Sequence, residues 1–319
     1  AGSGLLSVLA AGLGAGHVVA IEANPSLAAL AGQTIQRNRA AHRASNVTVA
    51  AELSSAVVPS CLPGGQPADV LVTETFGTTL LGEGAMNFVP DARDRLLKRG
   101  GTVIPAGGCQ YATLVEVPDL AATLRPSEWG GLNLTRLEAL MDTLYWKATV
   151  GASRTPMKRL SERICVLEVD LRVDTQESVP LNRTFRISAT QAGTVHAVLF
   201  DWDVWADASR SDVLSTAPGS RNFAGDVAWG WLLQPQEEVG DDWQVGQSPR
   251  PLVVGSGDRL DLAVEFVARG VSLHARVRRA PAVASEGGAP SAAAPPPRLA
   301  PGAGRGLPEA NDFYLPLAG

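Results

Sequence analysis

The hydrophobic pattern of this 319-residue chain changes near residue 105. Before that point, short apolar runs alternate with stretches of helical spacing. After it, strand-like runs follow one another with no strong helix between most of them. Alternating strands and helices are typical of βαβ units and a parallel, doubly wound sheet. Strands without intervening helices are typical of an antiparallel sandwich or barrel. We therefore expect an α/β domain followed by an all-β domain.

The first part carries capping residues as well as periodicity. Asn24 is a plausible N-cap, with Pro25 at the first helical position. Glycines at 100–101 are expected to end the third helix, as C-terminal glycines do. The expected helices are 5–13, 25–38 and 84–98, and the expected strands are 17–22, 47–50, 68–74 and 102–105.

The second part is expected to be β-rich, with one interruption. Residues 120–157 do not follow a strand rhythm and are expected to form an inserted helical or irregular arm. Residues 280–319 are dominated by Ala, Pro and Gly, a composition that buries too little apolar surface to fold, so we expect a disordered tail. The expected strands are 109–117, 164–173, 182–189, 194–203, 227–233, 259–266 and 271–277.

Composition restricts the partners. The net charge of −5 argues mildly against nucleic acid, because a phosphate backbone selects basic surfaces. No run approaches the ~20 apolar residues of a membrane helix, so no membrane partner is expected. Cys61, Cys109 and Cys165 lie far apart, without a CxxC pair or zinc-ligand spacing. We expect buried free thiols in a reducing compartment.

A glycine-rich turn precedes the first expected helix. Gly2 and Gly4 would let the backbone approach a ligand and aim helix N–H groups at it. Glu22 ends the next strand, 18 residues after Gly4, where an acid accepts hydrogen bonds from ribose hydroxyls. Dinucleotide sites usually carry a third glycine, but Ser7 stands at that position. The turn therefore favours S-adenosylmethionine over a nicotinamide dinucleotide.

Two carboxylates nine residues apart follow a buried strand. Glu74 ends that strand, where open α/β sheets place their ligands. Gly77 and Gly82 allow a tight loop that would bring Glu83 beside Glu74. Paired carboxylates suit a guanidinium, which presents its donors as a fork and is always charged. The alternatives are ordinary solvated loop acids or, with no His or Asp nearby, the less favoured metal pair.

These motifs together resemble the protein arginine methyltransferase family over residues 1–279. The segments that carry the resemblance are GSGLLS at 2–7, VVAIE at 18–22, DVLVTE at 69–74, the double-E loop pattern at 74–83 and RLLKRGGTVIPAGG at 95–108. The resemblance implies a Rossmann-like, S-adenosylmethionine-binding domain over residues 1–105, then an antiparallel β-barrel substrate domain over 106–279. It also implies a dimerisation arm near residues 120–157.

The resemblance implies methyl transfer from S-adenosylmethionine to arginine guanidinium groups of protein substrates. No metal is implied, and the expected assembly is a homodimer or a tandem-domain pseudo-dimer in the cytoplasm and/or nucleus. The implied residues are Glu74 and Glu83 for catalysis, Gly2, Gly4, Leu5, Glu22, Leu53 and Ser54 for the cofactor, and Trp229 for the substrate.

Three departures from the family pattern matter. The opening helices, first strand and first motif glycine are absent, which indicates an N-terminally truncated chain. The family's Thr-His-Trp loop corresponds here to Val-Ala-Trp at 227–229. Trp229 is therefore equally well interpreted as a residue of the arginine channel or as a buried residue of the barrel core. Ala56 stands where an acid usually contacts the adenine. Ala85 and Met86 resemble the divergent tandem-domain members, which are associated with monomethylation or symmetric dimethylation.

Two other functions remain open. The missing histidine and Ala56 suggest a catalytically degenerate module that acts in binding or dimerisation. A nicotinamide-dependent oxidoreductase is the third candidate, which Ser7 and the acidic loop disfavour. His196 lies in an apolar run and is expected to be a structural histidine of the β-rich domain.

Overall fold

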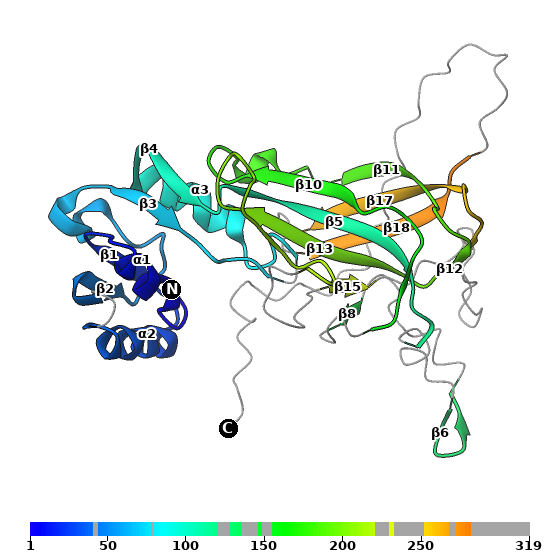
Figure 1. Ribbon diagram of the computed structural model, residues 1–319, viewed down its shortest axis with the longest axis horizontal. Coiled ribbons are helices and arrows are strands. Elements are labelled where there is room, and N and C mark those ends of the chain that lie inside the picture. Colours follow the sequence, from blue (N-terminus) through cyan, green and yellow to red (C-terminus); the bar gives the residue numbers. More distant parts are fainter. Residues whose placement is uncertain are drawn as a thin grey trace, which may run out of the picture. The chain divides into compact units, whose positions relative to one another are not determined.

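The computed structural model describes residues 1–40, 44–77, 79–119, 128–134, 146–148, 155–180, 182–220, 230–232, 252–267 and 272–281 (Figure 1). The chain divides into two units, Ala1–Ala280 and Pro281–Gly319. The helices and strands named below all belong to the first unit. Trp229 and nearly all of the tail lie outside the described residues.

The first part of this unit contains the predicted βαβ elements. Strand β1 pairs with β2 and strand β3 with β4, both in parallel. Asn24 caps α2 as predicted, since its Oδ1 accepts hydrogen bonds from the amides of Ser26 at 2.9 Å and Leu27 at 3.1 Å. The elements are α1 (Leu5–Gly12), β1 (Val18–Ile21), α2 (Pro25–Arg37), η1 (Ala44–Asn46), β2 (Val47–Ala50), η2 (Pro59–Cys61), η3 (Pro63–Gly65), β3 (Ala68–Val72), α3 (Ala85–Leu96) and β4 (Leu97–Ile104).

One apolar cluster joins the two parallel pairs, although no ladder connects them among the described strands. Arg95 strengthens this junction, because its guanidinium donates to the carbonyls of Val57 at 2.6 Å and Ser54 at 2.9 Å. The pairs therefore pack as one layered α/β part. The cluster contains buried Val57, Leu62, Ala92 and Leu96, against which Val19, Ile21, Ala50 and Leu71 pack.

The predicted end of the third helix was wrong. Helix α3 stops at Leu96, and β4 starts at once with Leu97. The double glycine lies inside the strand, where Gly100 has a φ of +76°. At Gly101, an added Cβ would lie 2.7 Å from the Leu97 side chain and 3.0 Å from the Asp69 carbonyl oxygen. These glycines thus allow close approach at an irregular strand pairing and do not cap the helix.

The second part is built from antiparallel sheets. One sheet has the order β10-β5-β13-β15-β8, with β14 on β13 and β9 on β5; a second has the order β11-β17-β18, and β12 pairs with β16. The bounds are β5 (Gly107–Glu116), β8 (Trp146–Ala148), β9 (Lys158–Arg159), β10 (Ile164–Asp170), η5 (Gln176–Ser178), β11 (Asn182–Ser188), β12 (Gly193–Val195), β13 (Ala197–Trp205), β14 (Val213–Ser215), β15 (Gly230–Leu232), β16 (Leu252–Val254), β17 (Arg259–Val267) and β18 (Ser272–Arg279).

These sheets form a curled half-barrel that is not closed. Within the described residues, only an isolated bridge between Ser161 and Ala189 links the first sheet region to the end of β11. The strand expected at 194–203 is interrupted at His196, which separates β12 from β13. Strand β8 lies within the interval 120–157 and pairs with β15, so part of the expected arm belongs to the sheet. The short β6 (Glu128–Trp129) and β7 (Leu132–Asn133) form a hairpin in the same interval.

The main core extends beyond the β-strands. Leu114 of β5, Val198 of β13 and Leu260 of β17 belong to one buried cluster, so the two sheets face each other across it (Figure 1). Leu80 and Leu81, which precede α3 in the chain, are each only 1% exposed and belong to the same cluster. The segment between β3 and α3 is therefore packed into the β-rich part.

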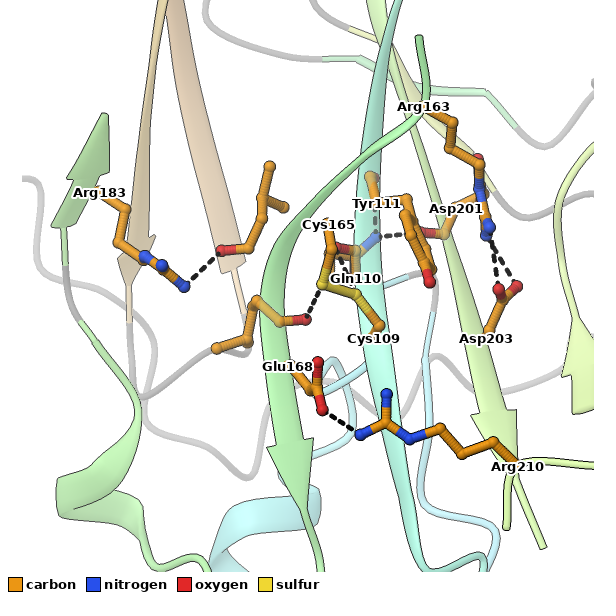
Figure 2. The surroundings of a disulfide bond; sticks show 12 residues. Cys109, Gln110, Tyr111, Arg163, Cys165, Glu168, Arg183, Asp201, Asp203 and Arg210 are labelled. Carbon is orange, nitrogen blue, oxygen red and sulfur yellow. Dashed lines mark hydrogen bonds and ion pairs between the residues drawn. A yellow bond between two sulfur atoms is a disulfide. The ribbon is translucent and has the colours of Figure 1, made fainter. Parts of the chain in front are cut away.

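The prediction of buried free thiols was wrong. Cys109 and Cys165 form a disulfide between β5 and β10, and Cys61 is free but exposed (Figure 2). Their α-carbons lie 6.1 Å apart, and the strand register shifts between Cys165 and Leu167. Sequence spacing did not reveal this disulfide, because it depends on the pairing of β5 with β10. The free cysteines were the reason for predicting a reducing compartment. Since disulfides persist mainly in oxidising environments, the cysteines no longer support that prediction.

None of the helices in the described ranges combines the length and the apolar character that a membrane crossing requires.

Candidate active site

The glycine turn forms the start of α1. Gly4 is the N-cap with a φ of +82°, and Gly2 has a φ of +54°. An added Cβ at Gly4 would lie 3.1 Å from the Cα of Ala31, whereas one at Gly2 would meet nothing within 4 Å. Gly4 is thus required for packing of the turn on α2. Gly2 leaves backbone facing open space.

We expect Gly4→Ala to destabilise the protein by about 2–4 kcal/mol, since it adds left-handed strain and a clash with buried Ala31. Gly2→Ala is the matched control, with the strain but no clash, and should cost about 1–2 kcal/mol. Urea denaturation of both variants measures the difference. Equal losses of stability would show that the Ala31 contact is unimportant.

Glu22 lies directly after β1 and turns back on the glycine turn. Its Oε2 accepts from the Gly2 amide at 2.7 Å and from the amino group of Ala1 at 3.0 Å. Its Oε1 accepts from the Asn24 amide at 2.9 Å. Partial burial raises the pKa of Glu22, but the hydrogen bonds from Asn24, Gly2 and the N-terminus outweigh it, so the net pKa is lowered. The carboxylate therefore stays ionised beside the turn.

The lowered pKa gives a signed pH prediction. Glu22 contributes stability that is present above its unfolded pKa, roughly 4.3, and that is lost as pH falls through the lower folded pKa. We expect Glu22→Gln to cost about 1–3 kcal/mol at pH 7, where the charged hydrogen bonds are intact. The cost should shrink steadily below roughly pH 4. Urea denaturation from pH 3 to 7 measures this, and a cost that is constant with pH would contradict the prediction.

Of the other expected cofactor residues, Leu5 begins α1, and Leu53 and Ser54 follow the end of β2. Leu5 is 58% exposed and Leu53 is 52% exposed, so both present apolar side chains to solvent. The carbonyl of Ser54 is held by Arg95, as described above. Glu22, Leu53 and Glu74 each follow the carboxyl end of a parallel strand, where open α/β sheets bind ligands.

The loop between β3 and α3 folds back on itself, as its glycines predicted. The amides of Gly77 and Gly82 both donate to the Thr79 carbonyl, at 3.1 and 2.9 Å. An added Cβ at Gly82 would lie 3.2 Å from the Cα of Gly77, so the two backbone segments are in contact. Glu83 follows this crossing, and its Cγ lies 3.4 Å from the Cβ position of Gly77.

Glu74 stands at the start of the loop and is exposed. Desolvation by surrounding protein raises its pKa, while the positive charge of the Ala1 amino group lowers it, and the net shift is upward. The same amino group contacts Glu22. The Glu74 carboxyl therefore takes up a proton more readily than that of an ordinary glutamate.

Comparison with known proteins supports the motif interpretation, although no protein-family profile matches the chain. It is 32% identical over 267 residues to an arginine N(omega)-methyltransferase of Streptomyces achromogenes subsp. streptozoticus, a match that covers 82% of this chain and 65% of that protein. It is 30% identical over 226 residues to protein arginine N-methyltransferase 7 of Caenorhabditis briggsae, which covers 69% and 33% respectively. The chain belongs to the protein arginine methyltransferase family.

A solved structure supports the fold of the chain. The Trypanosoma brucei PRMT1 enzyme–prozyme heterotetrameric complex with AdoHcy aligns with a TM-score of 0.67 at 18% identity. The alignment covers 88% of this chain and 83% of that chain. The chain spans about two thirds of the first curated relative and one third of the second.

The chain also carries a guanidinium–carboxylate cluster that the sequence did not predict. Arg163 pairs with Asp203 at 2.7 Å and with Asp201, and its guanidinium carbon lies 3.4 Å above the Tyr111 ring (Figure 2). Burial raises the pKa of Asp201, although Arg163 opposes that shift. The pKa of Arg163 is raised, because its hydrogen bonds to Asp203 and Asp201 outweigh the opposing effect of burial, so it stays charged.

His196 is structural, as predicted: its Nδ1 accepts a hydrogen bond from the Val117 amide at 3.1 Å. Among the residues that the structure describes, no group of three His, Cys, Asp or Glu side chains is placed to hold a metal ion.

Proposed function

We propose that the protein containing this chain transfers a methyl group from S-adenosylmethionine to the guanidinium of arginine residues in protein substrates. The observation that carries the proposal is the placement of Glu74. It follows the carboxyl end of β3, as Glu22 follows that of β1, and it begins the folded-back loop that leads to Glu83. A carboxylate there is suited to hold an arginine close to a cofactor bound at the turn.

The residues at the turn fit an adenosyl ligand. The backbone of Gly2 faces open space, and the Glu22 carboxylate uses three of its roughly four acceptor positions. Exposed Leu5 and Leu53 offer apolar surface. We assign Gly2, Gly4 and Leu5 to the methionyl end, Glu22 to the ribose, and Leu53 with Ser54 to the adenine.

When bound, S-adenosylmethionine supplies an electrophilic methyl on a positively charged sulfur. A guanidine nitrogen forms the new N–C bond as the C–S bond breaks, and the nitrogen then loses one proton to solvent. The roles of Glu74 and Glu83 are to bind the positive charge on the other guanidine nitrogens and to hold the reacting nitrogen in line. The products are methylarginine and S-adenosylhomocysteine.

The proposal also assigns substrate binding to Trp229, and assembly contacts in a homodimer or tandem pseudo-dimer to the arm near 120–157. Trp229 and most of this arm lie outside the described residues. A related structure is itself a heterotetrameric complex. The cytoplasm and/or nucleus is the proposed compartment.

Transfer of a labelled methyl group from S-adenosylmethionine to an arginine-rich peptide tests the activity. The expected result is labelled methylarginine in the peptide. Calorimetric titration with S-adenosylhomocysteine separates the alternatives. Binding without transfer would favour a catalytically degenerate module, and absence of both would refute the proposal.

A further inference from the structure

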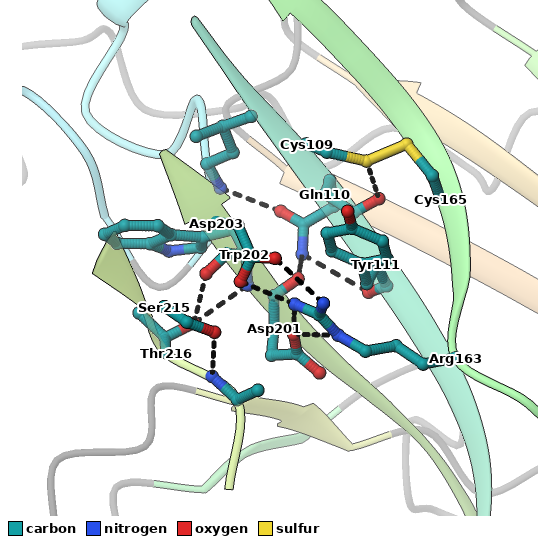
Figure 3. Close-up of polar contacts among 12 residues, drawn as sticks. Cys109, Gln110, Tyr111, Arg163, Cys165, Asp201, Trp202, Asp203, Ser215 and Thr216 are labelled. Atoms are coloured by element: carbon teal, nitrogen blue, oxygen red, sulfur yellow. Dashed lines mark hydrogen bonds and ion pairs between the residues drawn. A yellow bond between two sulfur atoms is a disulfide. The ribbon is translucent and has the colours of Figure 1, made fainter. Parts of the chain in front are cut away.

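Gln110 is a buried polar side chain that joins two segments far apart in sequence. It lies on β5 and is 1% exposed. Its Oε1 accepts a hydrogen bond from the Leu80 amide at 2.8 Å, and its Nε2 donates to the Asp201 carbonyl at 2.7 Å (Figure 3). Leu80 is in the loop between Glu74 and Glu83, and Asp201 is on β13. One amide therefore ties the loop to the centre of the antiparallel sheet.

Two further contacts hold the same loop. The indole Nε1 of Trp202 donates to the Gly77 carbonyl at 3.0 Å, and its ring centroid lies 5.7 Å from that of Phe76. At Gly108, an added Cβ would lie 2.9 Å from Leu80 Cδ1, so the glycine leaves room for that side chain. Residues of β5 and β13 thus hold the middle of the loop.

Burial makes the Gln110 contact difficult to replace. Leu80 is 1% exposed, and its amide has Gln110 as its acceptor. A buried amide left without an acceptor is destabilising, because it has lost its water and gained no partner. Loss of Gln110 therefore favours a shift of the loop until water or another acceptor reaches the Leu80 amide. Because Gly77 and Gly82 are in contact, such a shift moves the backbone on which Glu83 stands.

We infer that Gln110 is a positioning residue for the methyl transfer: it sets the position of Glu83 relative to Glu74 through the Leu80 amide. The inference rests on the proposed function. Gln110 touches the loop backbone and does not contact either glutamate in the hydrogen bonds described above. Its effect is therefore expected in the rate of transfer and not in the binding of the cofactor.

The test compares Gln110→Met with Ser161→Ala in the full chain. Methionine conserves the shape but removes both hydrogen bonds. Ser161 is also buried, and its hydroxyl accepts from the Leu114 amide at 3.0 Å, further along β5 and away from the loop. Gln110→Met leaves the buried Leu80 amide without its acceptor, and Ser161→Ala does the same to the buried Leu114 amide. We expect similar losses of stability from the two. Two measurements are made: kcat and KM of methyl transfer, and hydrogen exchange of the amides in residues 79–83.

For Gln110→Met we expect a fall in kcat of about 10²-fold, the effect of a misplacement near 1 Å, with KM for S-adenosylmethionine little changed. Exchange in residues 79–83 should become faster. Ser161→Ala should change neither. Equal kcat values in the two variants would overturn the inference. If the wild-type chain transfers no methyl group, the proposed function fails, and unchanged exchange in Gln110→Met then overturns the positioning role.

Gln110→Glu provides a second readout that a purely structural role would not move. An ionised carboxylate accepts from the Leu80 amide but has no proton to donate to the Asp201 carbonyl. Protonation restores that donor, and burial moves the pKa of such a carboxyl upward. The activity of Gln110→Glu relative to wild type should therefore rise as pH falls from 8 to 6. A ratio that stays flat or declines with falling pH would contradict the inference.

Discussion

Replacing Glu74 with glutamine is expected to lower kcat of methyl transfer by about 10²–10³-fold, the size of effect seen when one charge-stabilising group is removed from a reacting centre. The amide keeps the shape of the side chain but cannot pair with a guanidinium charge. The affinity for S-adenosylhomocysteine should remain near that of wild type, because cofactor contacts are assigned to the glycine turn. Calorimetry and steady-state kinetics on the same preparation measure both quantities.

The pH profile makes the expectation for Glu74 more specific. Desolvation raises its pKa, so it takes up a proton at higher pH than an ordinary glutamate, and the ionised form that pairs with arginine is lost there. Wild-type kcat/KM should fall on the acid side, and that limb should be absent in Glu74→Gln.

Glu83→Gln is expected to behave like Glu74→Gln, and the double variant should lose less than the product of the single losses, since the two carboxylates act as a unit. Glu162→Gln is the control, an exposed loop acid. Full activity in both loop variants would remove the proposed mechanism.

Local features of the α/β part were predictable from the sequence because they depend on nearby residues. The cap at Asn24, the left-handed turn at Gly4 and the fold-back at Gly77 follow from propensities within a few positions. The order of helices and strands followed from hydrophobic periodicity. The end of α3 and the strand break at His196, by contrast, depend on strand pairing. The pairing partners of a strand cannot be identified from a single sequence.

The contacts that fix the candidate site depend on residues far apart in the chain. Gln110 and Asp201 are 91 positions apart, and Trp202 and Gly77 are 125 apart. Gln110 meets Asp201 because β5 and β13 are neighbours in one register, in which Gln110 lies opposite Trp202. Trp202 meets Gly77 because the loop between β3 and α3 packs against these strands. The sequence signal for the role of Gln110 was a single glutamine in an apolar run. Without the register of β5 and β13, that signal identified no hydrogen-bond partner.

The largest effect on stability is expected at Arg163. Its guanidinium lies between two carboxylates and over Tyr111, and its side chain is 26% exposed while that of Asp201 is 2% exposed (Figures 2 and 3). Arg163→Met would leave a buried carboxylate without its counter-ion. Removal of one partner from a buried pair typically costs about 3–5 kcal/mol, and we expect a loss of about that size at pH 7.

The loss should depend on pH with a definite sign. Burial already raises the pKa of Asp201, and without Arg163 that pKa should rise further. A raised folded pKa means that the stability is present below the unfolded pKa and is lost as pH rises through the folded value. The destabilisation of Arg163→Met relative to wild type should therefore be larger at pH 8 than at pH 5. Urea denaturation at both values measures it.

Two companion variants separate charge from packing. Arg163→Met combined with Asp201→Asn should recover part of the lost stability and most of the pH dependence, because the buried charge is gone. Arg163→Lys should recover less than a charge count suggests, since an ammonium neither spans both carboxylates nor stacks on Tyr111 as a planar guanidinium does. If Arg163→Met were as stable as wild type, or equally destabilised at both pH values, the cluster would be a solvated surface pair and not an internal support of the sheet. The Asp201 carbonyl also accepts a hydrogen bond from Gln110, which holds the loop. If Arg163 proved unimportant, the pairing of β5 with β13 alone would hold Asp201 in place for this contact.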